Sequence, residues 1–111
     1  WIYFSSFLAT NLVKARKRLP GCGIGYLTYA GPTRILQQIF QPPPKTIDSL
    51  NPNRGSVTKR MVDHQHRLGR RVLAYTVNDQ EEMRKLFRIG VDGIFTDDPL
   101  TGNQVASEFQ N

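Results

Sequence analysis

The sequence has few of the residues from which redox and metal centres are built. It contains one cysteine, Cys22, so no internal disulfide can form. Its two histidines, His64 and His66, are two residues apart, whereas two metal ligands on one helical face are typically four apart. We therefore interpret both histidines as residues of a helix surface and Cys22 as part of a turn.

Long apolar runs are also missing. No stretch approaches the roughly 20 apolar residues that a membrane-spanning helix requires, and the apolar opening at 1–9 lacks the basic start and cleavage pattern of a signal peptide. We expect no integral membrane span and a soluble protein, with the cytoplasm as the favoured location. The chain starts at Trp1 rather than at a methionine, so we expect it to be part of a longer protein.

Acidic residues are scarce in the first part of the chain. Residues 1–71 carry 12 Lys or Arg against 2 Asp or Glu, whereas residues 72–111 carry 3 against 7, which together give the net charge of +6. An anion-binding or nucleic-acid-binding surface is one interpretation of this asymmetry. We favour solvated helix faces, because the basic run at 14–18 falls at the end of a predicted helix and aromatic residues are not interleaved with the cations. We thus predict no nucleic-acid partner.

The clearest pattern, at 70–97, is that of a strand, a helix and a second strand. The segment 72–77 is apolar and rich in strand-forming residues. Asn78 with Glu81 three residues later predicts a capped helix start, and Gly90 stands where a left-handed helix end is expected. The segment 91–96 then predicts a second strand. Short loops between these elements indicate a parallel βαβ unit.

The same order of elements recurs upstream. Further strands are predicted at 2–4, 24–29 and 46–50. Further helices are predicted at 8–19, around 35–39 and at 57–68, the last with Ser56 as its cap, and the prolines at 41–45 predict a loop. About five strands alternating with helices indicate an α/β fold. This count suits either a doubly wound sheet or the last part of an eight-stranded barrel.

Several segments carry a family resemblance. GVDGIFTDDP at 90–99, preceded by Tyr75-Thr76-Val77-Asn78, resembles the C-terminal signature of the glycerophosphodiester phosphodiesterase family, which more often has Trp where this chain has Tyr75. Ser5-Ser6-Phe7, Gly25-Tyr26-Leu27 and Asn51-Pro52 match the family's earlier strands in the same order. The resemblance covers nearly all of residues 2–100. It implies an α/β partial TIM (β/α)8 barrel, with residues 1–111 as the C-terminal portion that contains roughly the last five strands.

The resemblance also implies a function. The family consists of hydrolases of lipid metabolism that depend on Ca²⁺ or Mg²⁺ and cleave glycerophosphodiesters to an alcohol and glycerol phosphate. Its His-Arg-Gly and Glu-x-Asp motifs, which supply the catalytic histidines and metal ligands, are missing from this sequence. We therefore expect no catalytic residue and no metal ligand in the chain, and no activity of the chain alone. A non-enzymatic partial-barrel interaction module, or a degenerate remnant, is the alternative.

Four residues are candidates for substrate binding. The resemblance places Phe7, Leu27, Tyr75 and Asn78 at or near the carboxyl ends of strands, where barrel enzymes build their sites. Phe7 and Tyr75 could instead belong to the barrel core, and for Asn78 we favour the role of helix cap.

The acidic pair at 97–98 is interpreted as structural. Adjacent side chains on an extended segment diverge, so Asp98 is expected to cap a helix that starts at Pro99, and Asp97 to brace neighbouring loops.

A partial barrel exposes a strand edge on each side, which predicts self-association.

Overall fold

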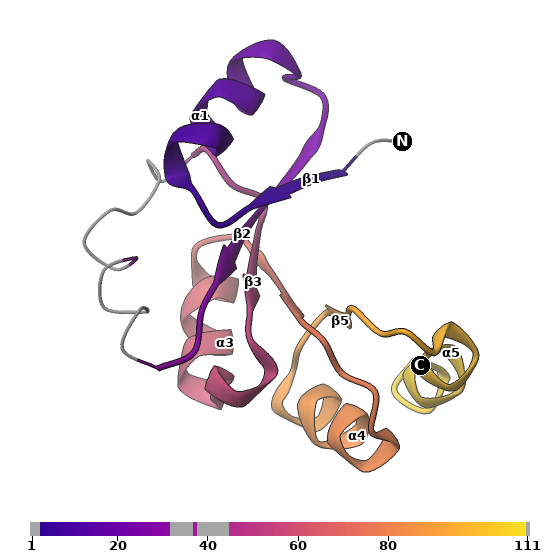
Figure 1. Cartoon of the computed structure of the whole chain (residues 1–111). Helices are drawn as coiled ribbons and strands as arrows, with labels where there is room; N and C mark the ends of the chain where they lie inside the picture. The colour runs from indigo at the N-terminus through magenta and orange to yellow at the C-terminus, as the bar shows by residue number, and fades with distance from the viewer. Residues whose placement is uncertain (1–2, 32–36, 38–44, 111) are drawn as a thin grey trace.

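The computed structural model describes residues 3–31, 37 and 45–110 (Figure 1). Five strands, β1 (Tyr3–Ser6), β2 (Gly23–Thr28), β3 (Ser49–Pro52), β4 (Arg71–Ala74) and β5 (Gly93–Ile94), form one sheet. Every neighbouring pair is parallel, and the order in the sheet follows the order in the chain. A doubly wound sheet reverses its strand order at a switch point. The unbroken order is therefore that of a segment of barrel wall, as predicted.

The helices lie around the outside of the curved row of strands (Figure 1). They are α1 (Ala9–Arg18), α3 (Lys59–Arg67), α4 (Gln80–Ile89) and α5 (Pro99–Ser107), with a 3-10 turn η1 (Arg54–Ser56) before α3. Within the described parts of the chain, no helix is long and apolar enough to cross a bilayer.

The core between helices and sheet consists of two clusters. One joins Leu12 and Ala15 of α1 to Ile24 and Tyr26 of β2. The other joins α3, α4 and α5 to β4 through the buried side chains of Val62, Val72, Ala74, Met83, Leu86 and Val105. Alternate residues of β2 and β4 thus point to the helices, which is the two-residue period of a strand.

Helix ends follow the expected chemistry at some residues and differ at others. Asp98 caps α5, and Pro99 is the first residue of that helix, as predicted. Gly90 ends α4 with φ of 112°. The predictions for Asn78 and Ser56 were wrong. Asp79 caps α4 by accepting from the Glu82 backbone N–H at 2.9 Å.

Ser56 lies in η1 and donates its hydroxyl to the Asn53 carbonyl oxygen at 2.8 Å. Thr58 is the cap of α3, because its Oγ1 accepts from the Met61 N–H at 3.1 Å.

The predicted strands at 72–77 and 91–96 are longer than β4 and β5. The chain continues past both strands with single hydrogen bonds, Phe95 N–H to the Ala74 oxygen at 2.8 Å and Val77 N–H to the Phe95 oxygen at 2.8 Å. The β-forming residues therefore stay extended, but without a regular ladder. The third strand covers 49–52 rather than 46–50. The helical turn predicted around 35–39 and most of the loop predicted at 41–45 lie outside the described residues.

An aspartate stands just before each of two strands and forms the same pair of contacts. Asp48, before β3, accepts the Ile24 N–H of β2 at 2.8 Å and pairs with Arg16 of α1 at 2.8 Å. Asp92, before β5, accepts the Val72 N–H of β4 at 2.8 Å and lies 2.7 Å from Nε2 of His66 on α3. In both cases the carboxylate joins the neighbouring strand to the helix that precedes that strand.

The face of the sheet opposite the helices carries a polar layer. The Tyr3 hydroxyl contacts the Ser49 hydroxyl, and the Asn51 amide donates to the Tyr3 hydroxyl at 2.9 Å. Ser49 also donates to Asn51 Oδ1 at 3.0 Å, and both side chains are buried. These groups occupy the space beside Gly25, where an added Cβ would lie 2.0 Å from Tyr3 Oη and 2.3 Å from Asn51 Nδ2.

We expect Gly25→Ala to lower the free energy of unfolding by about 1–3 kcal/mol, the usual cost of overpacking. The added methyl group would force the Tyr3–Asn51 layer apart. Gly21→Ala is the matched control, because a Cβ at Gly21 has nothing within 4 Å, and it should change stability by less than about 0.5 kcal/mol. Urea unfolding followed by circular dichroism measures both. Equal stabilities of the two variants would contradict the close packing at Gly25.

Candidate functional site

Aromatic side chains meet at the carboxyl ends of β1, β2 and β4. Phe7 directly follows β1, and Tyr75 directly follows β4. The Phe7 ring stacks on that of Tyr29, with centroids 4.2 Å apart and planes at 9°, and meets that of Tyr75 edge-on at 6.0 Å and 87°. The structure thus brings together the two predicted aromatic residues. Tyr29 was not predicted as a site residue, although its position two residues after Leu27 puts it on the same strand face.

Tyr75 is held in place by its hydroxyl. It donates a hydrogen bond of 2.7 Å to the carbonyl oxygen of Thr28, beyond the intervening strand β3. Burial raises the pKa of Tyr75, and a hydrogen bond with the Asn53 side chain partly opposes this shift. The hydroxyl stays protonated as a donor at neutral pH, so the ring presents an apolar edge rather than a charge.

Gln37 joins the ends of β1 and β2 through hydrogen bonds to their backbone. Its Nε2 donates to the Leu27 oxygen at 2.9 Å and to the Phe7 oxygen at 3.4 Å, and its Oε1 accepts the Tyr29 N–H at 2.7 Å. Leu27 itself is half-buried in β2, opposite Asn51 of β3. No sequence pattern singles out Gln37, because its partners are up to 30 residues away.

Asn78 does not cap α4, and its amide is used between the ends of β4 and β5. Its Oδ1 accepts the Asp97 N–H at 2.9 Å and the Thr96 hydroxyl at 3.1 Å. Its Nδ2 donates to Asp97 Oδ2 at 3.0 Å. Asp97 therefore braces the neighbouring loop, as predicted. Within the described residues, the Asn78 amide forms its hydrogen bonds with this loop, which makes it a positioning residue for the end of the sheet.

The carboxylates at this end of the sheet are engaged in structure. Thr101 donates its hydroxyl and its N–H to Asp98, and these bonds lower the pKa of the Asp98 carboxyl. Among the described residues, no group of three His, Cys, Asp or Glu side chains could hold a metal ion. Ca²⁺ and Mg²⁺ need several converging oxygens. The described residues therefore do not fit the divalent cation that the family resemblance implies.

The chain is similar to known proteins over nearly its whole length. Residues 1–101 match the model of the Glycerophosphoryl diester phosphodiesterase family. A glycerophosphodiester phosphodiesterase of Caldanaerobacter subterraneus subsp. tengcongensis is 29% identical over 100 residues, which cover 90% of this chain and 40% of that protein.

Solved structures agree with this match. A putative glycerophosphoryl diester phosphodiesterase of Silicibacter pomeroyi DSS-3 aligns over 96% of this chain and 38% of its own, with a TM-score of 0.78 and 28% identity. An Oleispira antarctica phosphodiesterase, solved in complex with the product sn-glycerol-3-phosphate, aligns over 95% of this chain and 41% of its own, with a TM-score of 0.74 and 24% identity. This chain therefore spans about two fifths of the length of these relatives.

We expect Asn78→Ala to lower the free energy of unfolding by about 1–2 kcal/mol, because three hydrogen bonds at a partly solvated site are lost. Thr76→Ala is the control, since Thr76 is exposed and has no hydrogen bond from its side chain within the described structure. Amide hydrogen exchange should show faster exchange at Asp97 in the Asn78 variant alone. Unchanged exchange at Asp97 would contradict the bracing role.

Proposed function

The chain belongs to the Glycerophosphoryl diester phosphodiesterase family, and we propose that residues 1–111 are the C-terminal portion of a metal-dependent enzyme that hydrolyses glycerophosphodiesters to an alcohol and glycerol phosphate. One observation carries the proposal: the described residues of the matched segment 1–101 include five consecutive parallel strands, with an aromatic cluster at their carboxyl ends. Barrel enzymes bind their substrates at that end.

In this proposal the chain supplies part of the substrate-binding wall. Phe7 presents an apolar ring without hydrogen-bonding groups, and the Tyr75 ring presents apolar surface because its hydroxyl already donates to Thr28. Such a surface suits the carbon skeleton of the glycerol or alcohol portion, and it keeps water away from one side of the diester. Leu27 extends the wall along β2, and Asn78 acts indirectly by holding the loop after β5.

Diester hydrolysis also requires groups that, in this proposal, come from outside the described residues. Acid and base groups must serve the attacking and leaving oxygens, and a divalent cation would polarise the phosphoryl oxygens. His66 contacts Asp92 at the amino ends of the strands, and Asp97 and Asp98 are bound by Asn78 and Thr101. We therefore assign to this chain neither a catalytic residue nor a ligand of Ca²⁺ or Mg²⁺.

We expect the 111-residue chain alone to release no glycerol phosphate from sn-glycero-3-phosphocholine above the buffer rate, with either Ca²⁺ or Mg²⁺. The Caldanaerobacter relative, assayed in parallel, is the positive control. A rate that EDTA abolishes and that follows the amount of folded chain would show that the chain contains its own catalytic groups.

A chimaera tests the wall separately from the missing chemistry. Residues 1–101 would replace the matching segment of the Caldanaerobacter relative. We expect metal-dependent activity, and a several-fold higher KM when Phe7→Ala or Tyr75→Ala is introduced. Leu100→Ala is the control, because Leu100 is 71% exposed on α5. Equal KM values for all variants of a folded, active chimaera would remove these rings from the substrate site.

The second candidate function is a partial-barrel module that associates with other chains. Within the described residues, β1 and β5 each have a strand neighbour on one side only. Unpaired strand edges offer backbone N–H and C=O groups to another strand.

Location in the cytoplasm and the lack of a nucleic-acid partner stay predictions from the sequence.

We expect sedimentation velocity of the isolated chain to show a mass that rises with concentration, because edge pairing is bimolecular. Folding of the sample is checked at each concentration by circular dichroism. A folded monomer at every concentration up to the millimolar range would contradict association through the strand edges.

A further inference from the structure

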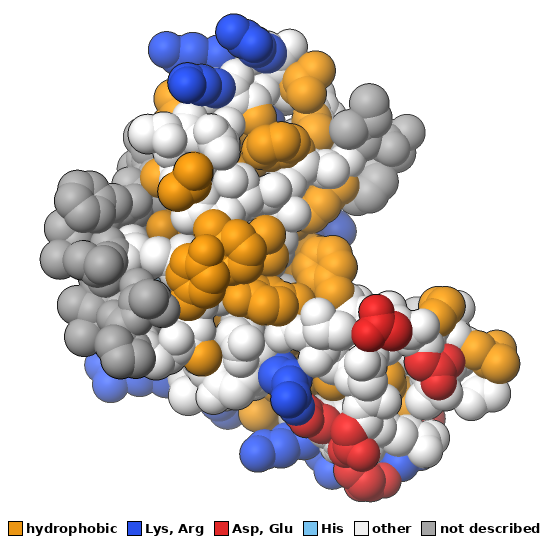
Figure 2. All heavy atoms as spheres, viewed as in Figure 1, with side chains coloured by type: hydrophobic (Ala, Val, Ile, Leu, Met, Phe, Trp, Pro, Cys, Tyr) orange, Lys and Arg blue, Asp and Glu red, His pale blue; other side chains and the backbone are white. Residues whose placement is uncertain are grey.

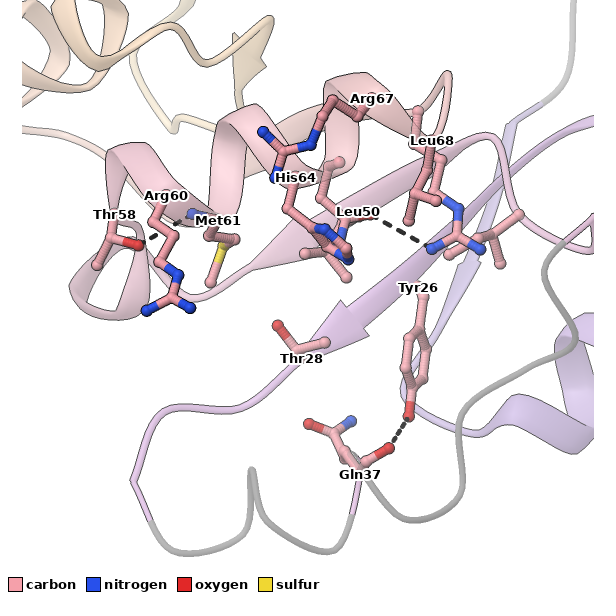
Figure 3. A pocket seen from close by; sticks show the side chains of 13 residues that line it. Tyr26, Thr28, Gln37, Leu50, Thr58, Arg60, Met61, His64, Arg67 and Leu68 are labelled. Carbon is pink, nitrogen blue, oxygen red and sulfur yellow. Dashed lines mark hydrogen bonds between the residues drawn. The ribbon is translucent and has the colours of Figure 1, made fainter.

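Tyr29 directly follows β2 and lies on the face of the sheet opposite the helices. Successive side chains of a strand point to its two faces in turn. Tyr26 and Thr28 line a hollow between β2 and α3, and Figure 3 shows both side chains on that helix side. The alternate positions, Leu27 and Tyr29, therefore face the other way. The contact between the rings of Tyr29 and Phe7 agrees with this orientation.

The Tyr29 ring covers one face of the Phe7 ring. Centroids 4.2 Å apart and planes at 9° leave no space for a ligand between the two rings. The Tyr75 ring meets Phe7 edge-on from another side, at 6.0 Å. A ligand that extends along the wall past Phe7 therefore contacts Tyr29 next. Tyr29 is 42% exposed, so part of its ring is open to such a ligand.

The backbone of both stacked residues is held by one amide. The Tyr29 N–H donates to Gln37 Oε1 at 2.7 Å, and Gln37 Nε2 donates to the Phe7 oxygen at 3.4 Å. Burial raises the pKa of Tyr75, and the Tyr29 phenol adds to this rise, as a second acidic hydroxyl nearby does. The three rings therefore form one surface whose members are already in place, so little freedom is lost when a ligand binds.

An aromatic surface of this kind distinguishes between alcohols by their charge. The face of an aromatic ring carries partial negative charge from its π electrons. It attracts a cation, and a methylated ammonium group suits it best because apolar methyl groups surround the charge. Glycerol has only hydroxyl groups, which would lose hydrogen bonds to water against an apolar ring.

We propose that Tyr29 is a specificity-determining residue of the diester site. Its exposed ring contacts the alcohol portion of the diester, and it favours an alcohol with a methylated ammonium group over one with hydroxyl groups alone. This inference rests on the proposed diesterase function. The ring face carries the preference, so Tyr29→Phe should keep it and Tyr29→Leu should lose it.

The chimaera that contains residues 1–101 measures this preference. The readout is the ratio of kcat/KM for sn-glycero-3-phosphocholine to kcat/KM for glycerophosphoglycerol. Tyr29→Leu should lower the ratio by about fivefold, which corresponds to about 1 kcal/mol, mainly through a higher KM for the choline ester. Tyr29→Phe should leave the ratio within about twofold of its original value, because both rings offer an aromatic face.

Phe109→Leu is the matched control, measured as binding to the 111-residue chain. Phe109 is 37% exposed and stacks on Phe87 of α4 with centroids 5.5 Å apart, so this change also removes a stacked, partly exposed ring. The chain is titrated with choline and, separately, with glycerol, and the ring proton signals are followed by NMR. Choline should shift the Tyr29 signals in the unchanged chain and in the Phe109→Leu variant alike. Glycerol should not shift them.

The two measurements separate this inference from the proposed function. A ratio that Tyr29→Leu leaves unchanged in a folded, active chimaera would overturn the inference, and so would equal choline shifts at Tyr29 and Phe109. A loss of preference in Tyr29→Phe would assign the selection to the hydroxyl and overturn the ring contact. An inactive chimaera with the unsubstituted segment contradicts the proposed function instead, and the choline titration then decides the role of Tyr29.

Discussion

Two carboxylates, each placed just before a strand, fix the neighbouring strands against the helices. Asp48 and Asp92 each accept an N–H of the preceding strand and contact a basic side chain of the helix before that strand. The Arg16–Asp48 ion pair and the His66–Asp92 contact are both partly exposed, and a surface ion pair is worth less than about 1 kcal/mol. The larger consequence is geometric. A slip of one residue would turn every side chain of the strand to the other face, and it would separate these carboxylates from their partners.

That register separates two unlike faces of one sheet. Ile24, Val72 and Ala74 point to the helices and are fully buried, with 0% exposure. Gly25 and Asn51 point the other way, where the Tyr3 hydroxyl fills the space beside the glycine. Barrel interiors are usually filled by bulky branched side chains. Here Gly25, Ser49 and Asn51, with the Tyr3 hydroxyl, occupy part of that face instead. Figure 2 shows the apolar and charged side chains on one face of the molecule.

Local patterns predicted much of this fold, and the errors have a common physical cause. The strand–helix–strand unit at 70–97 was predictable because its apolar period, cap and terminal glycine all agree. The cap was displaced by one residue. Asn78 and Asp79 can both cap a helix, and each has a glutamate three residues later. Asp79 is used because the Asn78 amide bonds to the loop after β5, a partner 18 or 19 residues away. No local pattern contains that information.

The same limit applied to the candidate site. Phe7 and Tyr75 were predicted to lie at strand ends, and they meet there, although their role in binding stays a proposal. Tyr29 and Gln37 were missed, because a stacked ring and a bridging amide become visible only when β1 and β2 are side by side. The pairing of His66 with Asp92 was also missed, since it joins residues 26 positions apart.

The segment at 90–99 shows why a family signature need not mark the chemistry of the family. Gly90 takes the left-handed conformation that ends α4. Asp92 sets the register of β4, and an added Cβ at Gly93 would lie 3.0 Å from the Leu73 side chain. Asp97 accepts the Asn78 amide, and Asp98 starts α5. Each of these residues has a structural partner within the segment or on a neighbouring strand or helix. Their contacts within the barrel wall are therefore sufficient to explain why these residues stand at these positions. A signature of this kind identifies the fold, whereas the catalytic groups must be found independently.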